Sequence, residues 1–228
     1  KKLSILAFAL LCTAALSAQH QRRVLDEEFT NASCGPCAAA NPAFNAVIDA
    51  NMQFVTPIKY QTNWPGADPM NVQTQTDVAP RVTYYGVSGV PNGRQNGALE
   101  VFPLSQMTTA SIAAAYNTLT PVTITASHSL NATYDSVYVT VAVTSDAALT
   151  GTLKLRVAVV EDVINFESAP GSNGETEFFQ IMRKMLPNSA GTTTGNFAAG
   201  ETKTYTFAWK LAYFYDLNTK FNYKINDK

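Results

Sequence analysis

The chain has 228 residues, of which 46% are hydrophobic and 14% are charged, and its formal net charge at pH 7 is −1. This length fits one or two domains, and the hydrophobic content is sufficient for packed cores. Because the charges are nearly balanced, the composition gives no reason to expect nucleic acid or an anionic membrane as a partner.

The first 18 residues have the pattern of a secretory signal peptide. Lys1 and Lys2 precede an apolar run over residues 3–16, which is too short for a transmembrane helix. We therefore expect cleavage after Ala18 and export to the periplasm, the outer-membrane surface or the extracellular space, with no transmembrane segment.

Three cysteines occur, and Cys12 lies inside the predicted signal peptide. Lipidation of Cys12 is the alternative, but apolar residues continue after it, which matches a lipoprotein signal poorly. The mature chain then keeps Cys34 and Cys37, which can form a disulfide with each other. A disulfide across so short a loop adds little stability through chain entropy, and this favours a redox role over a structural one.

Cys34 and Cys37 stand at a predicted strand-to-helix turn. An extended apolar segment around Val24 and Phe29 precedes them, and an alanine-rich helical stretch follows. The first sulfur of such a motif lies over the helix N-terminus, where unpaired N–H groups and the helix dipole favour a thiolate. The second sulfur, one turn further on, can close a disulfide. This pair is equipped to exchange two electrons with the cysteines of another protein.

Around this motif the chain resembles the thioredoxin superfamily. Gly35-Pro36 is the dipeptide that thioredoxins carry between their cysteines. Glu28 stands six residues before Cys34, at the position of a buried acid, and Pro42 matches a helix-kinking proline. Residues 85–91 resemble the segment that ends in a cis-proline facing the disulfide.

The resemblance implies an α/β thioredoxin-like domain over residues 19–119 and a division of roles among the site residues. Cys34 would attack a substrate disulfide, Cys37 would resolve the mixed disulfide, and Glu28 would take the proton of Cys37. The partners would be protein thiols or disulfides, and no cofactor or metal is implied. The residues expected to contact the substrate are Gly35, Pro36, Val90 and Pro91.

Three features depart from the superfamily pattern. Ser33 replaces the usual tryptophan before the first cysteine, and Ala38 replaces a common lysine after the second. Residues 92–97 are polar where an apolar strand is expected, so we expect a weak sheet edge there. Because alternate strand residues face opposite ways, Glu27 is the alternative to Glu28 as the buried acid, with Glu28 then facing solvent.

The periodicity of the sequence changes near Pro121. Residues 106–119 have apolar side chains at helical spacing, whereas later segments alternate with a period of two. Alternation is clearest in residues 137–143, 153–160 and 204–211. Several such strands separated by turns predict an all-β sandwich. We therefore assign residues 120–228 to a second domain, and we expect it to continue beyond residue 228.

This layout resembles a family of secreted outer-membrane proteins of Gram-negative bacteria, in which an immunoglobulin-like β domain follows a thioredoxin-like domain. The segment Glu27-Glu28-Phe29-Thr30 before the two cysteines carries the resemblance, together with residues 156–161 and 178–187. Membership of this family implies little about the substrate.

Other candidate sites are weak. His20 and His128 lie far apart in the sequence, so they do not predict a metal site. Acidic residues of the second half lack the spacing of a calcium loop and are interpreted as solvated loop acids. These acids are Glu161, Asp162, Glu175 and Glu177. Aromatic residues near the end of the chain are interpreted as packing residues rather than a ligand face. They are Trp209, Tyr213, Phe214 and Tyr215.

Two classes of function remain. In the first, the protein is an exported thiol–disulfide oxidoreductase that acts on envelope or surface proteins, and the β domain is a docking or anchoring module. In the second, the cysteines form an idle disulfide and the fold is the scaffold of a surface-binding or structural protein, adhesin-like or filament-like. The Gly35-Pro36 dipeptide and Glu28 favour the first class, and the polar residues 92–96 favour the second. The direction of electron flow stays open.

Overall fold

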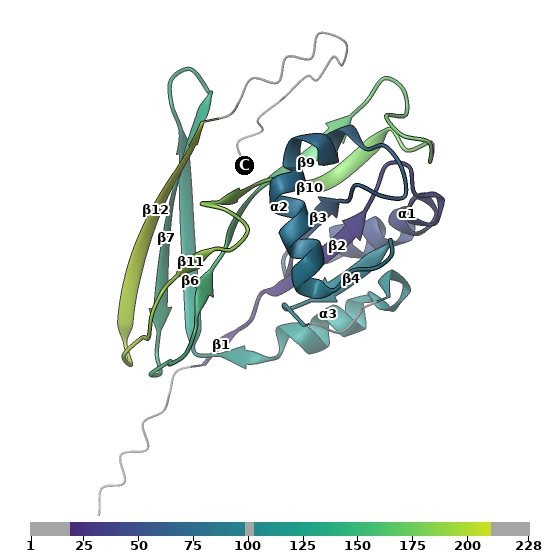
Figure 1. Ribbon diagram of the computed structural model, residues 1–228. Helices are drawn as coiled ribbons and strands as arrows, with labels where there is room; N and C mark the ends of the chain where they lie inside the picture. Colours follow the sequence, from purple (N-terminus) through teal and green to yellow (C-terminus); the bar gives the residue numbers. More distant parts are fainter. Residues whose placement is uncertain (1–18, 99–102, 211–228) are drawn as a thin grey trace, which may run out of the picture.

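The computed structural model describes residues 19–98 and 103–210, and its largest sheet has five strands (Figure 1). In their order across the sheet, these are β4 (Asn92–Gln95), β2 (Val24–Thr30), β3 (Val55–Gln61), β10 (Glu177–Leu186) and β9 (Val157–Asn165). Strands β2, β3 and β10 run parallel, and the outer strands run antiparallel to their neighbours. Because helices or strands cover both faces, β2 and β10 are buried along most of their length.

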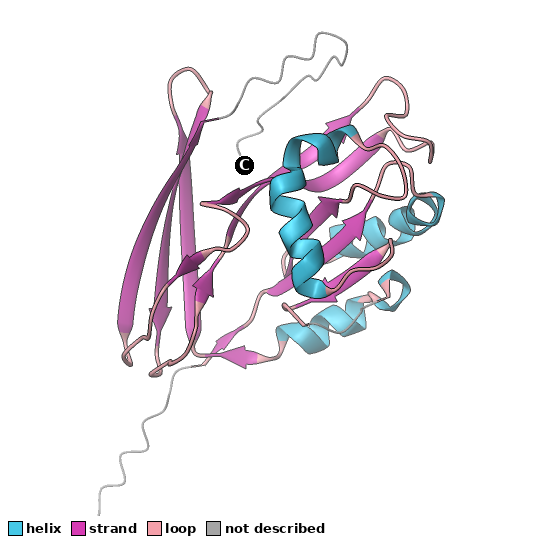
Figure 2. Cartoon of the chain, in the orientation of Figure 1, coloured by secondary structure: helices cyan, strands magenta, loops and turns pink. Residues whose placement is uncertain are grey.

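Helices cover the two faces of this sheet (Figure 2). Helices α1 (Gly35–Ala50) and α3 (Thr109–Tyr116) pack on one face with the short 3₁₀ helix η1 (Leu104–Gln106), and α2 (Pro69–Tyr85) packs on the other. The core under α1 and α3 contains Val24, Phe44, Ile48, Val55, Leu104, Met107 and Ile112. The core under α2 contains Phe29, Tyr60, Val78, Tyr85, Val87, Met182 and Met185.

A second sheet lies beside the first and has three strands in the order β12 (Glu201–Lys210), β7 (Ser136–Ser145) and β6 (Val122–Leu130). The predicted alternation is visible in β7, where every second residue is a buried valine. The remaining four strands of the described residues form two short antiparallel pairs. They are β1 (His20–Gln21) with β5 (Leu119–Thr120), and β8 (Lys154–Leu155) with β11 (Thr192–Thr193).

The structure divides the chain differently from the predicted boundary between residues 119 and 120. Strands β9 and β10 come from beyond that boundary, yet they complete the five-stranded sheet, with β10 parallel to β3. The chain then returns to the second sheet as β12. Leu186, at the end of β10, packs into the core of the second sheet with Val141 and Phe197. A fragment that ends at residue 119 therefore lacks the strand that covers the edge of β3.

Two local expectations also differ from the structure. The helix expected over residues 106–119 is interrupted, because Thr108 and Ser111 form a capping box that starts α3 after η1. The polar residues after Pro91 do form a strand, β4, and its Arg94 is buried. Arg94 donates to the carbonyl oxygen of Tyr85 at 2.9 Å, so this polar strand is anchored to the end of α2.

The described helices include none that is both long and apolar enough to cross a membrane. Together the strands and helices make a mixed α/β fold with several sheets, consistent with a thioredoxin-like domain joined to a β domain. The predicted signal peptide, and the aromatic residues from Tyr213 onward, lie outside the described residues.

Candidate functional site

Cys34 and Cys37 are joined by a disulfide at the start of α1. Strand β2 ends at Thr30, a short turn follows, and Cys34 is the N-cap residue of the helix. The backbone N–H of Cys37 donates to the sulfur of Cys34 at 3.1 Å. This N–H is one of the free donors that every helix N-terminus leaves, so it is available to stabilise negative charge on that sulfur. Both cysteines are buried, with exposed fractions of 1% and 0%.

The segment before Pro91 lies against this disulfide. The peptide bond between Val90 and Pro91 is cis, and the carbonyl oxygen of Val90 is 3.6 Å from the sulfur of Cys34. Gly35 and Pro36 are exposed beside the sulfur, and Val90 and Pro91 are half-buried. The residues predicted to contact a substrate are thus placed around Cys34, from two segments that are more than 50 residues apart in the sequence.

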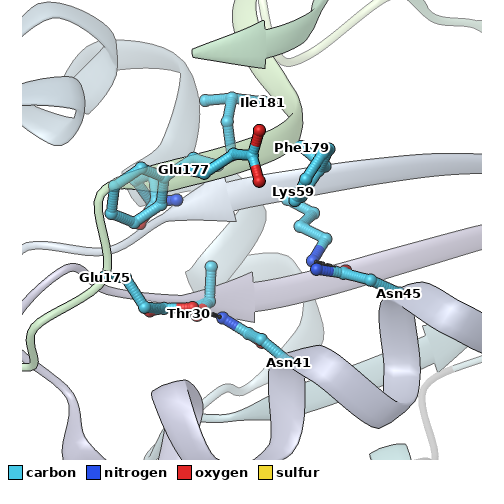
Figure 3. A pocket seen from close by; sticks show the side chains of 10 residues that line it. Thr30, Asn41, Asn45, Lys59, Glu175, Glu177, Phe179 and Ile181 are labelled. Carbon is cyan, nitrogen blue, oxygen red and sulfur yellow. Dashed lines mark hydrogen bonds between the residues drawn. The ribbon is translucent and has the colours of Figure 1, made fainter. Parts of the chain in front are cut away.

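Glu28 is buried on the side of the sheet that faces α1. Its carboxylate lies 2.9 Å from the ammonium group of Lys59, a buried residue of the neighbouring strand β3. Lys59 in turn donates to Asn45 of α1 at 2.6 Å (Figure 3). The alternative, in which Glu27 points inward and Glu28 faces solvent, is wrong, because β2 is covered on both faces and both glutamates are buried.

Glu27 points to the opposite face and is held by three side chains. Its carboxylate accepts hydrogen bonds from Arg81 at 2.6 Å and Tyr60 at 2.9 Å, and from the hydroxyl of Tyr85. Burial raises the pKa of both tyrosines, so they remain neutral donors to this carboxylate. Glu27 is therefore fixed under α2, away from the cysteines.

Asp26 is a third buried acid in the same strand, and it shares the α1 side of the sheet with Glu28. Burial raises its pKa from the ordinary value of 3.8 to about 8, and the negative charge of Glu28 adds to the rise while Lys59 opposes it. Its Oδ2 atom has no hydrogen-bond partner among the described residues. Burial therefore favours the neutral, protonated form of Asp26.

A small polar cavity lies between α1, β2, β3 and the segment that enters β10 (Figure 3). Its volume of about 10 Å³ is close to what one water molecule needs. Buried polar atoms at its wall lack a hydrogen-bond partner among the described residues, including Thr30 Oγ1, Asn41 Oδ1 and both side-chain atoms of Gln61. Polar groups without partners are costly in a buried position. This side of the sheet has more of them than the Glu27 side, where Arg81 Nε and Nη1 also lack partners among the described residues.

The turn before Cys34 is enclosed by two other loops, and this explains why a small residue, Ser33, stands at this position. Its hydroxyl donates to the carbonyl oxygen of Ala67 at 2.6 Å on one side and accepts from the N–H of Ser172 at 3.1 Å on the other. A Cβ atom at Gly66 would lie 2.7 Å from Ser33 Cβ, and one at Gly171 would lie 2.7 Å from its hydroxyl. The tryptophan usual at this position has no room here.

Several residues at the site were not predicted from the sequence. Lys59 lies in a segment with no feature that distinguishes it from other strands. Asp26 is the first of three consecutive acidic residues, and the sequence does not indicate which of them has an unusual environment. Asn173 and Glu175 come from the connection between β9 and β10, which was assigned to a separate domain. Their polar composition identifies a loop, but no pattern in the sequence indicates that this loop packs against the cysteines.

The remaining candidates are dispersed. His20 bonds to Asp146 at 2.6 Å, and His128 is exposed on β6. Glu175 accepts a hydrogen bond from Asn41, and Glu161 lies 3.4 Å from Arg183. Within the part of the chain that the structure describes, no three histidine, cysteine, aspartate or glutamate side chains converge as metal ligands.

The fold resembles that of HBP35 of Porphyromonas gingivalis, with a TM-score of 0.68 and 17% sequence identity. The match covers 84% of this chain and 65% of the HBP35 chain, so this chain spans slightly less than two thirds of the structure it matches. Protein AGR_C_4864 from Agrobacterium tumefaciens aligns with a TM-score of 0.49 and 16% identity, over 83% of this chain and 80% of that one. No protein-family model and no curated protein sequence matches the chain. At this identity, the likeness to HBP35 shows the fold alone.

Proposed function

We propose that this protein is an exported thiol–disulfide oxidoreductase that uses Cys34 and Cys37. The observation that carries the proposal is the position of the Cys34 sulfur, which receives a helix N-terminal N–H at 3.1 Å and lies 3.6 Å from the Val90 carbonyl oxygen. The N–H favours the thiolate that attacks, and the Val90 backbone gives an extended substrate segment a place to pair.

In the reduced protein, the Cys34 thiolate attacks one sulfur of a substrate disulfide. A bond forms between Cys34 and that sulfur, the substrate S–S bond breaks, and its second sulfur leaves as a thiolate. Cys37 then loses its proton and attacks the Cys34 sulfur, which releases the first substrate sulfur and closes the Cys34–Cys37 disulfide. Two electrons pass from the protein to the substrate. A partner dithiol restores the reduced pair by the reverse exchange.

Glu28 is proposed to accept the proton of Cys37 in the second step. It is buried on the α1 side of the sheet, where Cys37 also lies, and the ammonium group of Lys59 is 2.9 Å away. The charge of Lys59 compensates the carboxylate in a buried position, so that a base is available without contact with bulk solvent.

The proposed substrates are protein thiols or disulfides of the cell envelope or surface. The signal-peptide pattern of residues 1–18 supports export, and the compartments reached by export are those in which protein disulfides persist. The β domain, which we take to be immunoglobulin-like, would serve as a docking or anchoring module.

Selective alkylation of the reduced protein tests the assignment. The protein is reduced with dithiothreitol, freed of the reductant, treated with limiting iodoacetamide, and mapped by mass spectrometry. The adduct is expected on Cys34, and predominant labelling of Cys37 would contradict the proposed roles. In an insulin-reduction assay, Cys34→Ser should abolish turnover while Cys37→Ser accumulates the mixed disulfide. A parent protein that reduces no disulfide would overturn the proposal.

One observation favours a second candidate, a surface-binding or structural protein that uses the fold as a scaffold. Both cysteine residues are almost completely buried in the disulfide form, with exposed fractions of 1% and 0%. An idle disulfide should then resist reduction by dithiothreitol in the folded protein and open only after denaturation. Prompt reduction under native conditions would exclude this alternative.

A further inference from the structure

The connection between β9 and β10 packs directly on the turn that leads into Cys34. The backbone N–H of Asn173 donates to the carbonyl oxygen of Ala32 at 3.2 Å, and the N–H of Ser172 donates to the Ser33 hydroxyl at 3.1 Å. The approach is so close that a Cβ atom at Gly171 would lie 2.2 Å from the Ala32 oxygen. These contacts join residues about 140 positions apart in the sequence.

The Asn173 side chain makes the central contact. Its amide nitrogen lies 3.3 Å from the carbonyl oxygens of both Asn31 and Cys34, and 2.6 Å from a carboxylate oxygen of Glu175. Its amide oxygen accepts the backbone N–H of Glu175 at 2.9 Å. Because all three neighbours of the nitrogen are acceptors, the orientation of the amide is fixed. Glu175 takes one hydrogen, and the two carbonyls of the turn share the other.

Glu175 extends this contact to the helix. Its second carboxylate oxygen accepts a hydrogen bond from the Asn41 amide of α1 at 2.6 Å. Hydrogen bonds to a carboxylate are stronger than those between neutral groups. The Asn173–Glu175 pair therefore holds both the turn before the disulfide and the second turn of the helix after it, and it does so from a segment outside the CxxC motif.

We propose that Asn173 is a positioning residue for the reactive thiolate, and that Glu175 orients it. The Cys37 N–H reaches the Cys34 sulfur only while Cys34 keeps its extended N-cap conformation, with φ of −95° and ψ of 105°. The Asn173 amide restrains the carbonyl of Cys34 itself and that of Asn31 three residues earlier. Backbone hydrogen bonds from Ala38 to Cys34 at 3.1 Å and from Cys34 to Asn31 at 3.0 Å would remain without it. The turn would nevertheless gain freedom, and the sulfur would lose part of its hydrogen bond.

The inference rests on the proposed function in that it concerns the same thiolate, but its test needs no substrate. The rate of Cys34 alkylation by iodoacetamide is measured from pH 5 to pH 9 for the reduced parent and for Asn173→Ala. Loss of one hydrogen-bond restraint should move the midpoint of the profile upward and slow alkylation about 3- to 10-fold below the midpoint. Ser172→Ala is the matched control, because its hydroxyl lies 3.5 Å from the nearest acceptor while its backbone N–H is kept.

Glu175→Gln provides a second variant, which decides the question if Asn173→Ala does not fold. It should shift the profile in the same direction by a smaller amount, because the amide of Asn173 loses its charged acceptor. If the role of these residues is purely structural, the variants should have lower thermal stability but the same pH profile of Cys34 alkylation as the parent. This result would overturn the inference. A parent profile with its midpoint at the value of a free cysteine, about 8.5, would instead count against the proposed function.

Discussion

Glu27 and Glu28 are neighbours in one strand, yet the structure surrounds them very differently. Glu27 is held under α2 by an arginine and two tyrosines. Glu28 lies under α1 with one lysine, on the same side as Asp26, whose pKa is raised by burial. A polar cavity on this side has wall atoms without a hydrogen-bond partner among the described residues. Both carboxylate oxygens of Glu27 accept hydrogen bonds, whereas neither oxygen of Glu28 accepts one from the described residues, although the ammonium group of Lys59 lies 2.9 Å away. The two faces of β2 thus differ in how completely their buried acids are bonded.

The largest expected effect is on the Glu27 side. Glu27→Gln keeps the shape of the side chain but leaves the guanidinium of Arg81 buried without its charge partner. Removing one member of such a pair costs about 3–5 kcal/mol of unfolding free energy. Urea unfolding followed by circular dichroism measures this loss. The rate of insulin reduction by the folded variant should stay close to that of the parent.

Glu28→Gln should differ from Glu27→Gln in its effect on the rate of disulfide reduction. If Glu28 accepts the Cys37 proton, its loss slows disulfide reduction about 100-fold, the lower end of what general-base catalysis contributes. Its effect on unfolding free energy should be of similar size to that of Glu27→Gln, because Lys59 is left buried without its charge partner while its hydrogen bond to Asn45 is kept. Equal rates for the two variants would remove the functional difference between the two faces.

A third prediction concerns the pH dependence of stability. Because the pKa of Asp26 rises from 3.8 to about 8 on folding, the folded state keeps a proton that the unfolded chain has released. This contribution is fully present below about pH 4 and is lost as the pH rises through 8, by about 1.4 kcal/mol per pH unit.

Asp26→Asn should remove that slope, and its unfolding free energy should change less than that of the parent between pH 5 and pH 7.5. The exposed acid Asp49, changed to Asn, is the control and should leave the slope unchanged. A parent and an Asp26→Asn variant with parallel curves would show that Asp26 is ionised in the folded protein, and the contrast between the faces would then rest on Glu28 alone.

Much of the candidate site follows from local sequence. The position of Cys34 at the helix N-terminus depends on an extended apolar segment followed by a helical one, and both are short-range patterns. The burial of the acids was predicted only in part. Strand alternation correctly places Glu27 and Glu28 on opposite faces, but it does not indicate that both faces are covered.

Local patterns were enough to predict the Cys34–Cys37 pair, the strand before it, the helix after it and the alternation of β7 and β12. Other features became known only from the fold: β9 and β10 join the sheet of the first half, Lys59 pairs with Glu28, and Asn173 contacts the turn before Cys34. These contacts could not be predicted because they join segments that lie far apart in the chain. The periodicity of a sequence indicates which face of an element is apolar. A strand that is apolar on both faces can occupy the centre of any sheet, so its neighbours cannot be predicted from its own residues. The residues of a polar loop likewise do not indicate which segment the loop packs against.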